Sequence, residues 1–260
     1  MPKTNVDGVK INYRIVGDGP HTVLCLPGFL GTIDLDFQPF FDKADKTKFR
    51  WVCWDPPGYG DSRPPPREFT RNFWENDAEL VWKLMQKLGI KTYSVFGWSQ
   101  GGATGMILAA NNPESVQKLI TLGAEYAIDK NSVRVYSAMK GIDFWPEDKL
   151  KKQLKYYDQN YLKRMTEEMF DVAVEINTNN GGDFLRNTPS LIKCPVLIMH
   201  GTEDTTSPVE NAHKFHSKIK NSELKIFPTG KHDLHLTQTQ EAVEIKSTDG
   251  CMNYVGQTVP

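Results

Sequence analysis

The sequence predicts an α/β fold in which a mostly parallel central sheet carries helices on both of its faces. Short apolar runs typical of buried strands alternate along the chain with amphipathic stretches of helical periodicity. Polar, glycine-rich loops follow several of these runs, where the carboxyl ends of parallel strands are expected to form a ligand site. Strands are expected at residues 9–16, 22–26, 50–54, 92–96, 116–122, 195–200 and 224–227, and helices at 37–41, 73–88, 103–110 and 209–219.

Turn signals separate these elements in chain order. Residues 17–20 (GDGP) end the first expected strand. Gly89 ends the expected helix 73–88, which precedes the strand expected at 92–96. Residues 111–113 (NNP) stop the next helix. Each boundary is therefore marked by residues that favour turns.

The composition is that of an ordinary globular protein. Of 260 residues 39% are apolar and 24% charged, and the formal charge of −1 gives no general attraction to nucleic acid or anionic membrane. No apolar run is long enough to cross a bilayer, and the first residues lack the features of a signal or transit peptide. We therefore expect a cytoplasmic protein without nucleic-acid or membrane partners, and the oligomeric state is left open. The four cysteines are expected to be reduced thiols: Cys25, Cys53, Cys194 and Cys251.

One segment differs in character from the rest. Residues 127–193 are charged, lack a buried-strand run, and carry aromatic side chains among helix-forming residues. We expect this segment to be a helical cap inserted between two parts of the α/β core, residues 1–126 and 194–260. Its lysines are typical of a solvated helix face rather than of membrane docking. An irregular tail is expected from about residue 246.

Ser99 stands in the stretch around which the other elements are arranged. Residues 97–101 read Gly-Trp-Ser-Gln-Gly, between an expected strand and an expected helix. In this G-x-S-x-G pattern a sharp, strained turn exposes the serine hydroxyl above the sheet, and the flanking glycines let strand and helix pass closely. A short G-x-S-x-G also occurs by chance, so its strand and helix context carries the prediction of a nucleophile.

A second loop is expected to supply an oxyanion hole. Residues 27–31 (PGFLG) follow an apolar strand and are rich in glycine, so they can present backbone N–H groups above the sheet. We assign the two donors to the amides of Phe29 and Gln100, the second being the residue after the serine. The alternative is a plain turn without a catalytic part.

A base and an acid are then needed to activate the serine. His232 is the candidate base, because imidazole can accept and return a proton near pH 7, and Asp204 is the candidate acid that orients it. Both follow strand ends, in the order Ser, Asp, His. His235 is a rival base and Glu125 a rival acid. Glu203, beside Asp204, is expected to point the other way.

We expect no metal and no cofactor. His213 and His216 lie three residues apart on an expected helix, but no carboxylate completes a set of ligands there. A solvated helix face explains these histidines.

The motifs together resemble those of the α/β-hydrolase superfamily along nearly the whole chain. Within it the chain resembles the valacyclovir hydrolase (biphenyl hydrolase-like) group, through Trp98, residues 123–124 and residues 230–236. The resemblance implies a serine hydrolase of amino-acid esters with Ser99, Asp204 and His232 as its triad. The superfamily motifs are at residues 27–31, 55–60, 97–102, 200–204 and 230–232.

The chain departs from these relatives at two places. Where they have an aspartate thought to bind the substrate's α-ammonium group, this chain has the uncharged Gln100. Glu125 is a candidate to supply the missing carboxylate, and Gln100, Glu125 and Trp98 are the expected substrate-binding residues. The relatives also end in an amphipathic helix, whereas residues 237–245 offer at most a short one.

The predicted function is that of a serine esterase. It would cleave small carboxylic esters, α-amino-acid esters among them, through an acyl-enzyme intermediate. A carbon–carbon bond hydrolase or a lactonase on the same fold is an alternative, as is a catalytically silent binding module.

Overall fold

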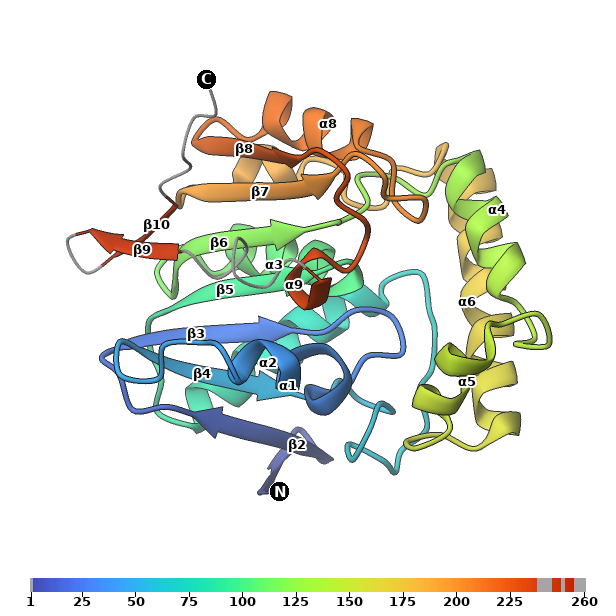
Figure 1. Ribbon diagram of the computed structural model, residues 1–260, viewed down its shortest axis with the longest axis horizontal. Helices are drawn as coiled ribbons and strands as arrows, with labels where there is room; N and C mark the ends of the chain where they lie inside the picture. Colours follow the sequence, from blue (N-terminus) through green and yellow to red (C-terminus); the bar gives the residue numbers. More distant parts are fainter. Residues whose placement is uncertain (1, 238–244, 249–250, 255–260) are drawn as a thin grey trace.

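A computed structural model gives the structure of residues 2–237, 245–248 and 251–254. An eight-stranded sheet forms its centre, in the order β1-β2-β4-β3-β5-β6-β7-β8 (Figure 1). β1 and β2 form an antiparallel hairpin, β2 pairs antiparallel with β4, and every pair from β4 to β8 is parallel. The strands are β1 (Lys3–Val6), β2 (Val9–Val16), β3 (His21–Leu26), β4 (Phe49–Trp54), β5 (Tyr93–Trp98), β6 (Val116–Leu122), β7 (Val196–Gly201) and β8 (Ser222–Phe227).

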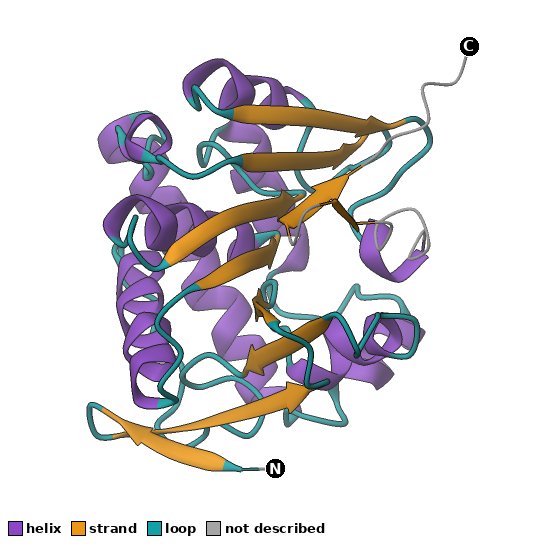
Figure 2. Cartoon of the chain, turned by 90° about the vertical axis from the view of Figure 1, so that its left-hand side faces the viewer, coloured by secondary structure: helices purple, strands orange, loops and turns teal. Residues whose placement is uncertain are grey.

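Helices cover both faces of the sheet (Figure 2). The larger apolar core lies under α2 (Phe73–Lys87), α3 (Gln100–Asn111) and α8 (Glu210–Lys218). The smaller core lies under a π-helical turn η1 (Ile33–Phe37), α1 (Gln38–Phe41) and α9 (Leu234–Thr237). The strands between the two layers are therefore buried on both sides, as their continuous apolar runs predict.

The regular elements of the segment between β6 and β7 are all helices. These are α4 (Lys130–Met139), α5 (Glu147–Gln153), α6 (Gln159–Asn180) and α7 (Thr188–Leu191). Figure 1 shows α4, α5 and α6 beyond the ends toward which the parallel strands point. We refer to residues 127–193 as the cap segment.

Hydrogen bonds and ion pairs connect the cap segment to the core. The Tyr161 hydroxyl donates to the Gly58 carbonyl at 2.7 Å and accepts from the Arg67 amide at 2.6 Å. An ion pair joins Arg71 Nε and Glu175 Oε1 at 3.5 Å. The cap segment is therefore anchored to loops that follow β4 in the chain.

The expected elements agree with the structure to within a few residues. Each expected strand is observed within two residues of its bounds. β1 was not expected, because its sequence KTNV is too polar to indicate a buried strand. It lies at the edge of the sheet, where it pairs with β2 alone. The helix expected at 37–41 is preceded by the π-helical turn η1.

Two short strands cover part of the segment that the sequence predicts to be an irregular tail. β9 (Ile245–Thr248) and β10 (Cys251–Tyr254) pair as an antiparallel hairpin. The short helix expected in 237–245 falls largely on residues 238–244, outside the described residues. Across the part of the chain that the structure describes, no helix is long and apolar enough for a membrane span.

Candidate active site

Ser99 sits at the tight turn between β5 and α3. Its φ of 53° and ψ of −119° are strained for a residue with a side chain, as the motif predicts. A Cβ atom at Gly97 would lie 2.4 Å from the Gly101 carbonyl oxygen, and one at Gly101 would lie 2.2 Å from the Leu26 carbonyl oxygen. Glycine at both positions is therefore required by the close approach of backbones.

The structure brings Ser99, His232 and Asp204 into one hydrogen-bonded chain. His232 Nε2 lies 3.0 Å from Ser99 Oγ, and His232 Nδ1 lies 2.7 Å from Asp204 Oδ2. Ser99 follows β5, Asp204 follows β7 and His232 follows β8. Because these strands are parallel, their carboxyl ends meet at one edge of the sheet.

Asp204 is held rigidly behind the histidine. Its second oxygen, Oδ1, accepts from the amides of Thr206 at 2.9 Å and Ser207 at 2.8 Å. His200, itself buried, lies with Nε2 2.6 Å from the Ser207 carbonyl and 3.4 Å from Asp204 Oδ2. Because a carbonyl only accepts, His200 carries its proton on Nε2.

These partners keep Asp204 ionised. Burial by itself raises the pKa of Asp204. The hydrogen bonds from His200 and His232, with the charge of His232 and the Ser207 amide, outweigh it and hold the pKa well below its usual range. A charged carboxylate therefore faces the Nδ1–H of His232 at neutral pH.

The rival residues do not take the places of His232 and Asp204. His235 is fully buried against Trp98, with ring centroids 4.6 Å apart, and burial lowers its pKa to about 3. Glu125 accepts from the Tyr136 hydroxyl at 2.7 Å rather than from His232 Nδ1. The side chain of Glu203 is exposed. The geometry thus places His232 and Asp204 beside Ser99.

Trp98 links two loops of the site. Its indole Nε1–H donates to the His232 carbonyl at 2.8 Å. On another side, a Cβ atom at Gly28 would lie 2.9 Å from the Trp98 ring, so the glycine-rich loop packs directly on the indole. The substrate contact expected of Trp98 stays a prediction.

The two amides assigned to an oxyanion hole are available as donors. In the described residues, neither the Phe29 amide nor the Gln100 amide has a hydrogen-bond acceptor. The first amides of a helix such as α3 lack partners within the helix. Both amides are thus free to bind an external oxygen.

The remaining candidate residues lie around this centre. The side-chain oxygen of Gln100, a largely buried residue, accepts from the Tyr59 hydroxyl at 3.2 Å. Tyr136 holds Glu125 and also meets the Phe29 ring edge-on, with centroids 6.3 Å apart. Burial raises the pKa of Glu125, while hydrogen bonds and the nearby His232 oppose this shift. Glu125 is therefore a half-buried acid near the histidine, hydrogen-bonded to α4 of the cap segment.

The sequence analysis missed three residues of this region. Tyr59, Tyr136 and His200 contact predicted site residues, but no role was assigned to them. Tyr59 and His200 lie within the motifs at residues 55–60 and 200–204, whereas Tyr136 lies in no motif. His200 carried a further signal, because it lies at the end of a strand directly before the loop of Asp204. Tyr136 carried none, because it lies in the cap segment away from every motif.

A metal site is not apparent in the described part of the chain. There, no group of three or more His, Cys, Asp or Glu side chains could hold an ion. His213 and His216 lie on the exposed face of α8, and His216 Nδ1 lies 2.9 Å from Ser222 Oγ.

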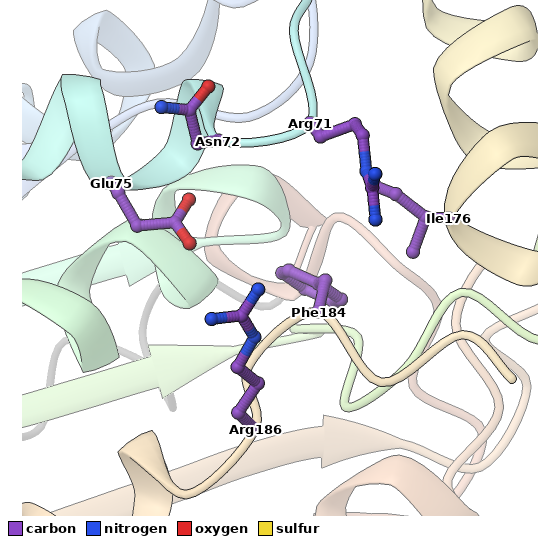
Figure 3. Close-up of a pocket in the computed structure, with 6 residues that line it drawn as sticks. All are labelled: Arg71, Asn72, Glu75, Ile176, Phe184 and Arg186. Atoms are coloured by element: carbon purple, nitrogen blue, oxygen red, sulfur yellow. The ribbon is translucent and has the colours of Figure 1, made fainter. Parts of the chain in front are cut away.

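A separate pocket of about 270 Å³ lies between the start of α2, α6 and the loop before α7 (Figure 3). Figure 3 shows the guanidinium groups of Arg71 and Arg186 directed into it from two sides. Burial raises the pKa of Glu75 there, with Arg186 opposing the shift. This pocket shares no residue with the Ser99 site. It is lined by Arg71, Asn72, Glu75, Ile176, Phe184 and Arg186.

Comparisons with known proteins agree with this fold. A family model described as the alpha/beta hydrolase fold matches residues 21–135. The serine hydrolase BPHL of Mus musculus is 37% identical over 239 residues, covering 92% of this chain and 82% of that protein. Two solved structures share the fold. The esterase EaEST of Exiguobacterium antarcticum has a TM-score of 0.70 at 22% identity, covering 92% of this chain and 94% of its own. The enol-lactonase of Burkholderia xenovorans LB400 has a TM-score of 0.68 at 19% identity, covering 94% and 97%.

Proposed function

The chain belongs to the α/β-hydrolase family and is a serine hydrolase, and from this premise we propose that it is an esterase acting on small carboxylic esters. The observation that carries the proposal is the chain of hydrogen bonds from Ser99 through His232 to Asp204, at 3.0 and 2.7 Å. Its order and geometry are those that activate a serine for acyl transfer.

Acylation follows from these contacts. His232 Nε2 takes the proton of Ser99 as its Oγ attacks the ester carbonyl, and the carbonyl oxygen becomes an oxyanion. The amides of Phe29 and Gln100 receive that oxyanion. His232 then gives its proton to the leaving alcohol, and an acyl-enzyme remains.

Deacylation repeats these steps with water as the nucleophile in place of Ser99. His232 takes a proton from water, hydroxide adds to the acyl carbon, and the carboxylic acid leaves as the proton returns to Ser99. Asp204 keeps the proton of His232 on Nδ1 and stabilises the imidazolium in both halves.

For the acyl group we propose an α-amino acid, whose ammonium group binds Glu125. Two observations support this. Glu125 lies close enough to His232 for their charges to interact, and its hydrogen bond from Tyr136 fixes the carboxyl group. Gln100 brings no charge and already accepts from Tyr59. A hydrogen bond to a charged group contributes about 1.5–3 kcal/mol, so Glu125→Gln is expected to reduce the preference for α-amino esters roughly ten- to a hundredfold.

A panel of p-nitrophenyl esters with and without an α-amino group tests both proposals. Hydrolysis by the wild type and none by Ser99→Ala is expected. An unchanged ratio of amino to non-amino rates in Glu125→Gln would contradict the ammonium site while leaving the esterase intact.

The same panel separates the alternatives. Labelling of Ser99 by a fluorophosphonate without ester hydrolysis would favour a lactonase or a carbon–carbon bond hydrolase. Inertness to both reagents would favour a binding module. We also propose a cytoplasmic location and no nucleic-acid or membrane partners. The formal charge of −1 supports the second point, because it gives no general attraction to nucleic acid or anionic membrane.

A further inference from the structure

The loop that carries Phe29 is anchored by a buried carboxyl group. The Gly28 amide donates to Asp36 Oδ2 at 2.9 Å, and the Gly31 amide donates to the Gly28 carbonyl at 3.1 Å. Leu30, inside the turn, has a φ of 60°. The direction of the Phe29 amide therefore depends on where the preceding Gly28 amide is held.

Local structure delivers the Asp36 carboxyl to this point. Asp36 lies on the π-helical turn η1, whose N-cap Thr32 accepts from the Leu35 amide at 3.1 Å. Asp36 is only 4% exposed. A Cβ atom at Gly31 would lie 1.9 Å from Asp36 Oδ2, so the carboxyl fills the space that a side chain would need. The turn and the glycine together bring carboxyl and loop into contact.

Burial at this place disfavours the charged form of the Asp36 carboxyl group. Burial raises the pKa of Asp36 to about 8, and the charge of Asp55 adds to this, while the Gly28 hydrogen bond opposes it. The shift favours the neutral acid, whose carbonyl oxygen can still accept from the Gly28 amide. The carboxyl group gives the buried Gly28 amide its acceptor, whereas an apolar side chain of similar size would leave that amide without one.

We propose that Asp36 is a positioning residue of the oxyanion hole, which holds the Gly28 amide and so directs the Phe29 N–H toward the oxyanion. Asp36 itself does not touch the substrate. The inference rests on the proposed function, because it presumes that Phe29 is an oxyanion donor.

Two variants of the same residue test the role. Asp36→Asn keeps a neutral carbonyl acceptor for Gly28, whereas Asp36→Leu keeps the approximate volume without one. Loss of a complete oxyanion donor costs about 10²- to 10³-fold in rate. A misdirected donor costs part of this, so Asp36→Leu is expected to slow labelling of Ser99 by a fluorophosphonate roughly ten- to a hundredfold. Asp36→Asn is expected to stay within about threefold of the wild type, since its acceptor is retained.

Transition-state binding separates positioning from a structural role. A boronic acid forms a tetrahedral adduct on Ser99 with an oxygen in the oxyanion hole. Its inhibition constant is expected to rise in Asp36→Leu in proportion to the lost rate, at an unchanged KM. Asp42→Leu is the matched control, because Asp42 is exposed and its carboxyl bonds only to Gln38 Nε2 at 3.0 Å among the described residues. It is expected to behave as the wild type.

The outcomes are distinct. Wild-type labelling and boronate affinity in correctly folded Asp36→Leu, or an Asp36→Asn variant as slow as Asp36→Leu, would overturn the inference. If Asp36→Leu does not fold, Gly31→Ala displaces the carboxyl from the other side and is expected to give the same slow labelling. A wild type inert to the probe would overturn the proposed function itself. Labelling without ester hydrolysis would overturn only the esterase assignment, and the labelling rates would still decide the role of Asp36.

Discussion

Asparagine at position 204 is expected to hold His232 in the wrong tautomer. Asp204 Oδ1 accepts from the Thr206 and Ser207 amides at 2.9 and 2.8 Å, and Oδ2 faces His232 Nδ1 at 2.7 Å. In Asp204→Asn the amide oxygen must stay on the side of the two N–H donors, because an NH₂ group there would meet two donors. The NH₂ group then faces His232.

This orientation changes which ring nitrogen of His232 carries the proton. His232 Nδ1 becomes an acceptor, so the proton moves to Nε2 and points at Ser99 Oγ, 3.0 Å away. The ring then cannot take the serine proton. The expected loss in kcat is about 10³- to 10⁴-fold, or about 4–5.5 kcal/mol of transition-state stabilisation.

The measurement is kcat for the best p-nitrophenyl ester, with thermal unfolding as a check on the fold. Ser99→Ala sets the background rate. An Asp204→Asn variant within tenfold of the wild type would refute the reasoning. It would show that another acid, with Glu125 the first to test, orients the histidine.

Three further predictions follow from other contacts. Asp77→Ala leaves the buried Arg67 guanidinium without its two 2.8 Å hydrogen bonds. It is expected to cost about 3–5 kcal/mol in urea unfolding, most of it restored by pairing Arg67→Met with Asp77→Leu, and a cost near zero would contradict this. Trp98→Phe loses the bond to the His232 carbonyl, and kcat should fall about three- to tenfold, for about 0.5–1.5 kcal/mol, at a similar Tm. A fully active variant would show that the bond does not hold the loop. Because the folded-state pKa of Asp204 is depressed, its contribution to stability is present above about pH 4 and is lost as the pH falls. The Tm difference between wild type and Asp204→Asn should therefore shrink from pH 6 to pH 3, and a constant difference would contradict the assignment.

The fold was predictable because its signals are local. A strand buried on both faces needs a continuous apolar run, and residues 116–122 are both expected and observed as β6. The polar strand β1 and the hairpin of β9 and β10 lacked such runs. Their pairing is decided by a neighbouring strand, which a local pattern does not contain.

The candidate site was predictable only in part. The glycines around Ser99 mark a turn that few other residues allow, so this position is readable from five residues. The choice of His232 over His235 depends on which ring reaches a serine 133 residues away in the chain. Sequence proximity does not separate two histidines three residues apart.

The sequence by itself determined the parallel α/β architecture and placed a serine, an acid and a histidine after strand ends, because periodicity and turn chemistry act over a few residues. The tertiary structure alone decided which groups share hydrogen bonds: Tyr136 with Glu125, and Asp36 with the Gly28 amide. These contacts join a helix of the cap segment to a strand end and a π-helical turn to a loop. They depend on how elements pack, which sequence spacing does not encode.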